Sequence, residues 1–130
     1  MKHYNVVAAV VCHDGKYLCM QKGKTKFEYT SYKWEFPGGK IEPGETPQQA
    51  LARELMEEME YPVEVGEELV TLNHEYPDFS ITMTAFLCTP KGDADGFKRR
   101  EHADSKWCSK DELKGLNWAA ADVGVVASIL

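Results

Sequence analysis

The chain has 130 residues, of which 43% are hydrophobic and 28% are charged, the ordinary composition of a globular protein. Its formal net charge of −6 argues against duplex nucleic acid as a partner, because duplexes are bound by a basic face. The sequence contains no run of about 18 apolar residues, so we expect no membrane-spanning helix. It predicts one domain over residues 1–130, and a cytoplasmic location because no signal peptide is recognised at its start.

The first predicted elements are two strands and a loop. Val6–Val11 and Lys16–Gln21 are apolar runs on either side of residues 13–15, whose types favour a turn. The next segment, residues 23–33, is polar and aromatic without clear periodicity, and we expect a loop near the functional site. A short extended stretch at Trp34–Phe36 follows, since proline disfavours helix in the residue before it.

A bend and a helix come next. The Pro-Gly-Gly sequence that ends at Gly39 predicts a tight bend. Thr46 can cap a helix, Pro47 suits its first turn, and Gln49 completes a capping box. The helix is expected to extend to about Met59, because a proline follows shortly after it.

The second half of the chain alternates between strands, loops and short helices. Its patterns predict strands at Val63–Asn73, Ser80–Thr89 and Lys106–Cys108 and a loop at Lys91–Gly96. Ser109 and Glu112 form a second capping box, which opens a short helix ending at Gly115, and residues 122–130 predict a final helix. This order of elements predicts an α/β (α+β) fold in which helices cover both faces of a mixed β-sheet.

Neither the cysteines nor the histidines form a recognisable metal site. None of the four cysteines belongs to a Cys-x-x-Cys pair, and their apolar surroundings predict buried or half-buried thiols. The four histidines share no spacing typical of zinc sites. We expect His102 to be an exposed loop residue, and the alternative is a place near the metal beside its neighbour Glu101.

The predicted helix carries three carboxylates on one side. Glu54, Glu57 and Glu58 stand at positions i, i+3 and i+4, which share a helical face. Like charges at this spacing destabilise a helix by about 0.2–0.5 kcal/mol per pair. One explanation is an acidic face in contact with solvent, and the other is a hard cation such as Mg²⁺, which prefers carboxylate oxygens. The preceding glycine-rich stretch, residues 38–45, favours the cation, because glycine lets a ligand or metal approach the backbone closely.

These residues resemble the Nudix box, written G-x5-E-x7-R-E-U-x-E-E-x-G-U with U apolar. The matching positions are Gly39, Glu45, Arg53, Glu54, Leu55, Glu57, Glu58 and Tyr61. The sequence departs once, because Glu60 stands where the family has the glycine that ends the helix. The neighbouring Trp34–Glu42 and the later Glu101-His102 resemble the MutT-like branch, whose members include 8-oxo-dGTP diphosphatases and CTP pyrophosphohydrolases.

The resemblance implies a Nudix-type α/β/α sandwich and a role for each matching residue. The implied Mg²⁺ ligands, with Mn²⁺ able to substitute for Mg²⁺, are the carboxylates of Glu54, Glu57, Glu58 and Glu101 and the backbone carbonyl of Gly38. Arg53 would complete the catalytic set by orienting the glutamates, and Glu45 would support the loop before the helix. Whether Glu57 or Glu58 is the base or a ligand stays open.

Three further residues are implied in substrate binding. Lys22 stands where arginine usually contacts phosphate, and lysine keeps the charge but lacks the bidentate fork. Asp122 matches the position that holds the base edge in relatives, although it also suits a helix cap. Phe36 either stacks on the base or belongs to the core. Phe79 follows a stretch where some oxidised-guanine enzymes carry arginine, which weakens a strict 8-oxoguanine assignment.

The resemblance therefore implies a nucleoside triphosphate pyrophosphohydrolase that releases a nucleoside monophosphate and pyrophosphate. Oxidised or modified (d)NTPs such as 8-oxo-dGTP are among the implied substrates, with a role in DNA repair. The expected partner is a small nucleotide, with no membrane partner, and the protein is expected to be a monomer or homodimer. The alternatives are a hydrolase of another nucleotide diphosphate, such as ADP-ribose or a dinucleoside polyphosphate, and a nucleotide-binding Nudix domain without catalysis.

Overall fold

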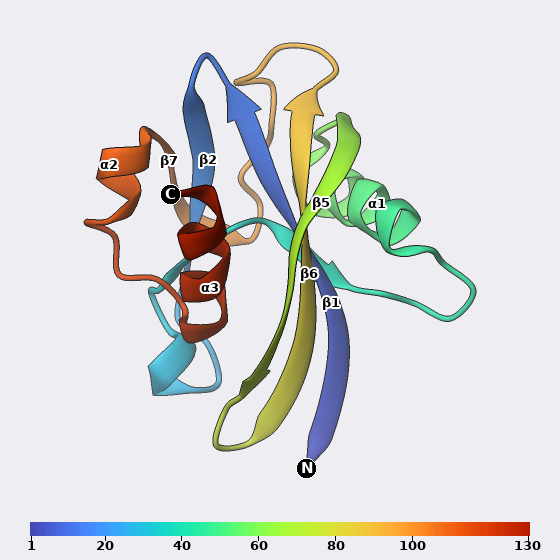
Figure 1. Ribbon diagram of the computed structural model, residues 1–130, viewed down its shortest axis with the longest axis vertical. Helices are drawn as coiled ribbons and strands as arrows, with labels where there is room; N and C mark the ends of the chain where they lie inside the picture. Colours follow the sequence, from blue (N-terminus) through green and yellow to red (C-terminus); the bar gives the residue numbers. More distant parts are fainter.

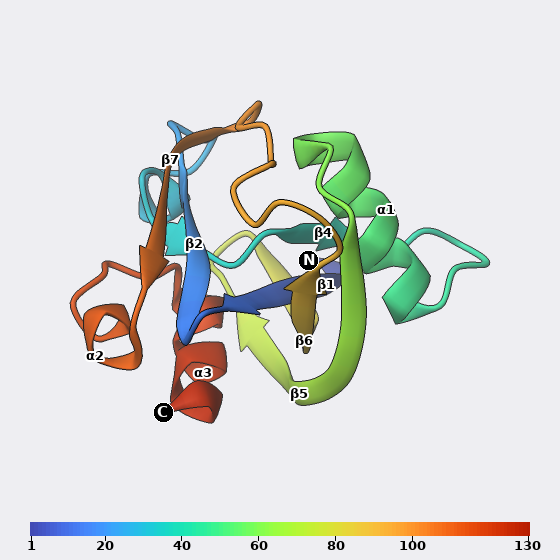
Figure 2. The same ribbon diagram turned by 90° about the horizontal axis from the view of Figure 1, so that it is seen from above.

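Side chains alternate along β1 (Lys2–His13) and divide the core into two layers. Val7 and Val11 are buried with residues of α1 (Pro47–Met59), whereas Ala8 and Val10 are buried with residues of α3 (Ala120–Ile129). Because successive side chains of a strand point to opposite faces, such an uninterrupted apolar run suits a strand that is covered on both sides. The computed structural model, which describes residues 1–130, has α1 and α3 on opposite sides of the sheet (Figure 1 and Figure 2).

Seven strands form a mixed sheet. The other six are β2 (Lys16–Lys22), β3 (Trp34–Glu35), β4 (Gly38–Lys40), β5 (Val63–Glu75), β6 (Phe79–Pro90) and β7 (His102–Cys108). Their order is β3-β2-β1-β6-β5, with β4 paired to β1 and β7 paired to β2. β1 and β6 run parallel, and every other pair is antiparallel. The predicted sandwich of helices around a mixed sheet is confirmed.

Two short helical segments complete the chain. A 3-10 helix, η1 (Glu28–Thr30), interrupts the loop between β2 and β3, and α2 (Lys110–Leu113) follows β7. Ser109 caps α2 and forms the predicted capping box with Glu112. None of the helices has the length and hydrophobicity needed to cross a membrane.

The helix α1 has the ends that local signals predict. Thr46 accepts the Gln49 N–H at 3.1 Å, and the Gln49 side chain accepts the Thr46 N–H at 2.9 Å, which confirms the capping box. The apolar stripe that includes Leu51 and Met59 is fully buried, so α1 docks on the sheet by this side. After the helix, Glu60 has φ 47° and ψ 42°, the left-handed conformation that glycine adopts most easily.

The tight bend predicted at the Pro-Gly-Gly sequence is confirmed at Pro37 alone and is wrong for the two glycines. Gly38 and Gly39 belong to β4 and pair with Ala8 and Val7 of β1. A Cβ atom at Gly38 would overlap the carbonyl oxygen of Val7, and one at Gly39 would overlap the carboxylate of Glu54. Both glycines therefore allow a close approach rather than a turn.

The strand β7 is longer than the sequence predicts. It begins at His102 instead of Lys106, because it pairs with β2 from Tyr17 to Lys22. The prediction of an exposed loop histidine is wrong, since the His102 side chain lies at this start of the strand and is only 6% exposed. By contrast, the cysteines are free thiols, buried or half-buried as predicted.

Candidate active site

A pocket of about 1160 Å³ opens on the side of the sheet that carries α3. Its polar lining includes the side chains of Lys22, Glu35, Glu58, Glu101 and His102 and the backbone of Gly38 and Gly39. Its apolar lining includes Tyr4, Val6, Phe36, Tyr76, Phe79, Ile81 and Met83. One cavity therefore offers both charged groups and an apolar, aromatic surface to a ligand.

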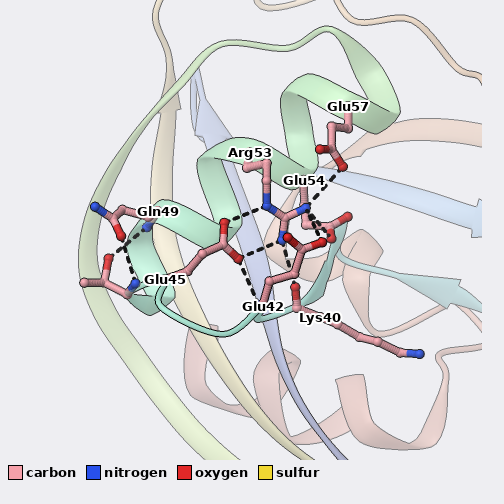
Figure 3. A network of polar contacts seen from close by, with 8 residues as sticks. Lys40, Glu42, Glu45, Gln49, Arg53, Glu54 and Glu57 are labelled. Carbon is pink, nitrogen blue, oxygen red and sulfur yellow. Dashed lines mark hydrogen bonds and ion pairs between the residues drawn. The ribbon is translucent and has the colours of Figure 1, made fainter.

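Arg53 is the centre of a polar network on α1 (Figure 3). Its Nε and Nη2 donate to the two carboxylate oxygens of Glu45 at 2.6 and 2.9 Å. Its Nη1 donates to Glu54 at 3.0 Å and to Glu57 at 3.1 Å, and its Nη2 also donates to the Lys40 carbonyl at 3.1 Å. The hydrogen bonds from Arg53 lower the pKa of Glu45 below its ordinary value. The guanidinium thus ties two of the three clustered glutamates to the loop before the helix.

Glu58 and Glu101 face the pocket from two separate elements. Glu58 comes from α1, whereas Glu101 comes from the segment just before β7. Burial raises the pKa of Glu58 to about 8, and interaction with Glu54 and the charge of Glu101 act in the same direction. Glu57 differs from Glu58, because its side chain is 62% exposed and contacts Arg53. The pocket therefore makes the charged form of Glu58 unfavourable, and a bound cation would relieve this cost.

A chain of three polar side chains lies beside these carboxylates. Lys22 Nζ is 3.4 Å from one oxygen of Glu35, and His102 Nε2 is 2.9 Å from the other. The Nδ1 atom of His102 is buried without a hydrogen-bond partner. Glu35 was not among the site residues predicted from the sequence, although it stands as a charged residue between Trp34 and Phe36. Glu35 holds Lys22 and His102 in place at the pocket wall.

Asp122 is buried at the pocket wall. It is 2% exposed, and its Oδ1 accepts the Phe36 N–H at 3.0 Å. The alternative of a helix cap is wrong, because Ala119 occupies the N-cap position of α3, no side chain caps this helix, and Asp122 lies inside its first turn. Burial and the negative charge of Glu35 raise the pKa of Asp122 to about 8. A protonated carboxyl can donate a hydrogen bond as well as accept one.

Phe36 packs at the same wall. It is 3% exposed, and its ring stacks on that of Trp118 with centroids 4.8 Å apart. It therefore belongs to the core and also lines the pocket. The phenol of Tyr76 accepts the Ala121 N–H at 3.1 Å and fixes the first turn of α3 beside the cavity.

Comparison with known proteins identifies the family. Residues 1–128 match the model of the NUDIX domain. The chain belongs to the Nudix family. A CTP pyrophosphohydrolase from Escherichia coli (strain K12) is 34% identical over 131 residues, covering 100% of this chain and 93% of that protein. An 8-oxo-dGTP diphosphatase from Proteus vulgaris is 40% identical over 88 residues, covering 68% of this chain and 78% of that protein.

Solved structures agree with this assignment. The E. coli ORF135 protein superposes with a TM-score of 0.82 at 33% identity, covering 99% of this chain and 89% of that one. A MutT protein of the Nudix hydrolase family from methicillin-resistant Staphylococcus aureus gives a TM-score of 0.75 at 39% identity, covering 99% and 97%. The resemblance to MutT-like Nudix hydrolases is confirmed, and the protein is a hydrolase that acts on phosphoric anhydride bonds.

Nudix hydrolases generally use divalent metal ions, and the oxygen donors of this chain fit such an ion. Glu54, Glu58 and Glu101 could supply carboxylates and Gly38 a backbone carbonyl, and hard cations prefer oxygen ligands of both kinds. The missing side chain of Gly39 leaves the space in which the Glu54 carboxylate lies. No three Asp, Glu, His or Cys side chains are gathered as a ready metal cluster, and Arg53 engages two of the expected ligands.

Arg53→Lys is expected to lower kcat/KM by about 10–100-fold, the usual effect of removing a group that orients metal ligands by hydrogen bonds. A lysine ammonium cannot reproduce the fork to Glu45 while also reaching Glu54 and Glu57. Steady-state hydrolysis measures the loss, and the far-UV circular dichroism spectrum checks that α1 is retained. A folded variant with the wild-type kcat/KM would contradict an orienting role.

Proposed function

We propose that this Nudix hydrolase is a Mg²⁺-dependent nucleoside triphosphate pyrophosphohydrolase that releases a nucleoside monophosphate and pyrophosphate. Mn²⁺ substitutes for Mg²⁺, and the substrates include oxidised or modified (d)NTPs such as 8-oxo-dGTP. The observation that carries the proposal is the single cavity lined by Glu58, Glu101 and Lys22 as well as by aromatic residues. A triphosphate and its base fit into this one space. The names of the relatives from E. coli and Proteus vulgaris support the same class of substrate.

The metal would be held by Glu54, Glu57, Glu58, Glu101 and the Gly38 carbonyl. When bound, Mg²⁺ neutralises polyphosphate oxygens and lowers the pKa of a coordinated water. The chain's own residues then supply orientation and charge. Lys22 contacts the phosphates. Arg53 orients the carboxylates of Glu54 and Glu57 by hydrogen bonds.

Glu58 and Glu101 are our candidates to receive the proton of the attacking water, because a bound cation would favour the charged form of Glu58. Both line the pocket, and the ordinary distance over which a base takes a proton is about 2.6–3.2 Å or one bridging water. Glu57 is a poorer candidate, since its side chain is mostly exposed and contacts Arg53. Of the two residues, we therefore propose Glu58 rather than Glu57 as the base, a role that it would fill from the edge of the metal-binding face.

Base recognition is assigned to the wall formed by Asp122, Phe36 and Tyr76. Asp122 is the buried polar group there, and one of its oxygens is already engaged by the Phe36 N–H. The second oxygen has no partner in the protein and is available to the base edge. Phe79 lines the apolar part of the cavity and brings no positive charge to it.

The test is a product-resolved screen with Mg²⁺ and with Mn²⁺. Unmodified and modified (d)NTPs, ADP-ribose and dinucleoside polyphosphates are incubated with the enzyme, and phosphorus NMR identifies the products. We expect nucleoside monophosphate and pyrophosphate from (d)NTPs. Preferred cleavage of ADP-ribose or a dinucleoside polyphosphate would replace the proposal by the first alternative. Absence of hydrolysis with either metal would favour a nucleotide-binding domain.

A further inference from the structure

Glu60 occupies a position that is unfavourable for a glutamate on two counts. Its φ of 47° lies in the left-handed region, where side chains other than glycine are strained. It also follows the C-terminal end of α1, where the helix dipole disfavours a negative charge. The Nudix box has glycine here, which would avoid both costs. A compensating interaction of the Glu60 side chain is therefore expected.

The structure contains that interaction. Oε2 of Glu60 is 3.0 Å from Nζ of Lys98 and also pairs with the guanidinium of Arg100. The same segment reaches the helix by two further bonds. The Lys98 N–H donates to the Met59 carbonyl at 2.7 Å, and Arg100 Nη1 donates to the Glu57 carbonyl at 3.4 Å. Two cationic residues thus cap carbonyls at the end of α1, and Glu60 binds both of their side chains.

This contact has a direct link to the pocket. Glu58 and Glu101 both line the cavity. Each is close in sequence to a partner of the ion pair, since Glu60 comes two residues after Glu58 and Arg100 comes directly before Glu101. The connection from residue 91 to residue 101 has no regular secondary structure. Its first part is anchored by the Tyr61 hydroxyl on the Ala94 carbonyl. Its last part, residues 98–101, contacts α1 through the ion pairs of Lys98 and Arg100 with Glu60.

We propose that Glu60 is a positioning residue that acts through Lys98 and Arg100. It holds residues 98–101 on the last turn of α1 and so keeps Glu101 beside Glu58. The inference rests on the proposed function, because it takes Glu101 as part of the metal-binding face. Glu60 itself does not line the pocket.

The experiment compares Glu60→Gly with the wild-type protein. Glycine removes the backbone strain and the ion pairs together, so Tm is expected to be unchanged or higher. Amide hydrogen exchange of residues 98–101 in the metal-free protein is expected to accelerate about tenfold. The half-saturating Mn²⁺ concentration, followed by the electron paramagnetic resonance of free Mn²⁺, is expected to rise about tenfold, as for other groups that orient ligands.

Charge reversal and rescue separate this role from a general effect. Glu60→Arg keeps the strained backbone but repels Lys98 and Arg100, so it should accelerate exchange further. Adding Arg100→Glu restores one ion pair, so exchange should slow and Mn²⁺ affinity should rise relative to Glu60→Arg alone. The recovery is expected to be partial, because Lys98 still faces a positive charge and the bond to the Glu57 carbonyl is lost. The matched control is Glu67→Arg, an exposed site on β5 with the same change of charge, which should behave as wild type.

Three results would overturn the proposal. The first is wild-type exchange at residues 98–101 in Glu60→Gly, and the second is faster exchange with unchanged Mn²⁺ affinity. The third is exchange that accelerates across the whole sheet with a lower Tm. Exchange and Mn²⁺ binding need no turnover, so a wild-type protein that hydrolyses no (d)NTP would refute the proposed function separately.

Discussion

Glu58→Gln is expected to lower turnover by about 100- to 10,000-fold and, at the same time, to raise the Tm of the metal-free protein. The loss of turnover follows from removing a carboxylate that ligates the metal or accepts the proton. The gain in Tm follows because burial, Glu54 and Glu101 make the charged form of Glu58 unfavourable, with its pKa raised to about 8. Glutamine has nearly the same shape and carries no charge.

The two effects are measured on the same samples. Calorimetry at a pH above the raised pKa of Glu58, without divalent ions, gives Tm, and initial rates with Mg²⁺ give kcat. Glu64→Gln, an exposed substitution on β5, is the control and should leave both unchanged. A Glu58→Gln enzyme with the wild-type rate would remove Glu58 from the metal face. An unchanged Tm would show that its carboxylate is well solvated.

Asp122→Asn is expected to change the ratio of kcat/KM between nucleotides with different bases by about 10–100-fold, while the dependence on Mg²⁺ stays the same. Asparagine keeps an oxygen for the Phe36 N–H but presents an amide where the carboxyl had a second oxygen. Asp122→Ala is the less informative variant. It would leave the Phe36 N–H buried without an acceptor, at a cost of about 1–3 kcal/mol.

The same substitution predicts a pH dependence of stability. The folded pKa of Asp122 is raised to about 8 from an ordinary value of 3.8. Its contribution to stability is therefore fully present below pH 3.8 and is lost as the pH rises to about 8. An asparagine side chain does not titrate, so the Tm of Asp122→Asn minus that of wild type should grow across this range and then level off.

Parallel measurements of substrate ranking and of Tm against pH test the two roles of Asp122. An unchanged base ranking would show that Asp122 serves the fold alone. A Tm difference that does not vary with pH would show that the carboxyl is ionised throughout, as in a solvated aspartate.

Local signals explain why α1 could be predicted closely. The Thr46 and Gln49 capping box, the buried stripe and the following proline all act within a few residues of the helix. They do not tell Glu57 from Glu58, because both stand on the same helical face. The difference arises from packing, which turns Glu57 to Arg53 and brings Glu101 opposite Glu58 from a distant part of the chain.

Long-range pairing explains the predictions that were wrong. Glycine serves both tight turns and close backbone contacts, and the pairing of Gly38 with Ala8 decides between these uses. An exposed loop was predicted at His102, but its pairing with Lys22 on β2 places it in a strand, where its side chain contacts Glu35. Neither contact leaves a trace in the local sequence.

The two glycines of β4 also join the two layers of the molecule. Glu58 belongs to the helix on one side of the sheet, yet it lines a pocket whose apolar wall lies on the other side. Gly38 and Gly39 line the same pocket. A side chain at Gly39 would overlap the Glu54 carboxylate of α1, whereas one at Gly38 would overlap the backbone of Val7 in β1. Replacing either glycine is therefore expected to displace the acidic helix or the sheet, and so to change the distance between the carboxylates and the opposite layer, although no charged residue is altered.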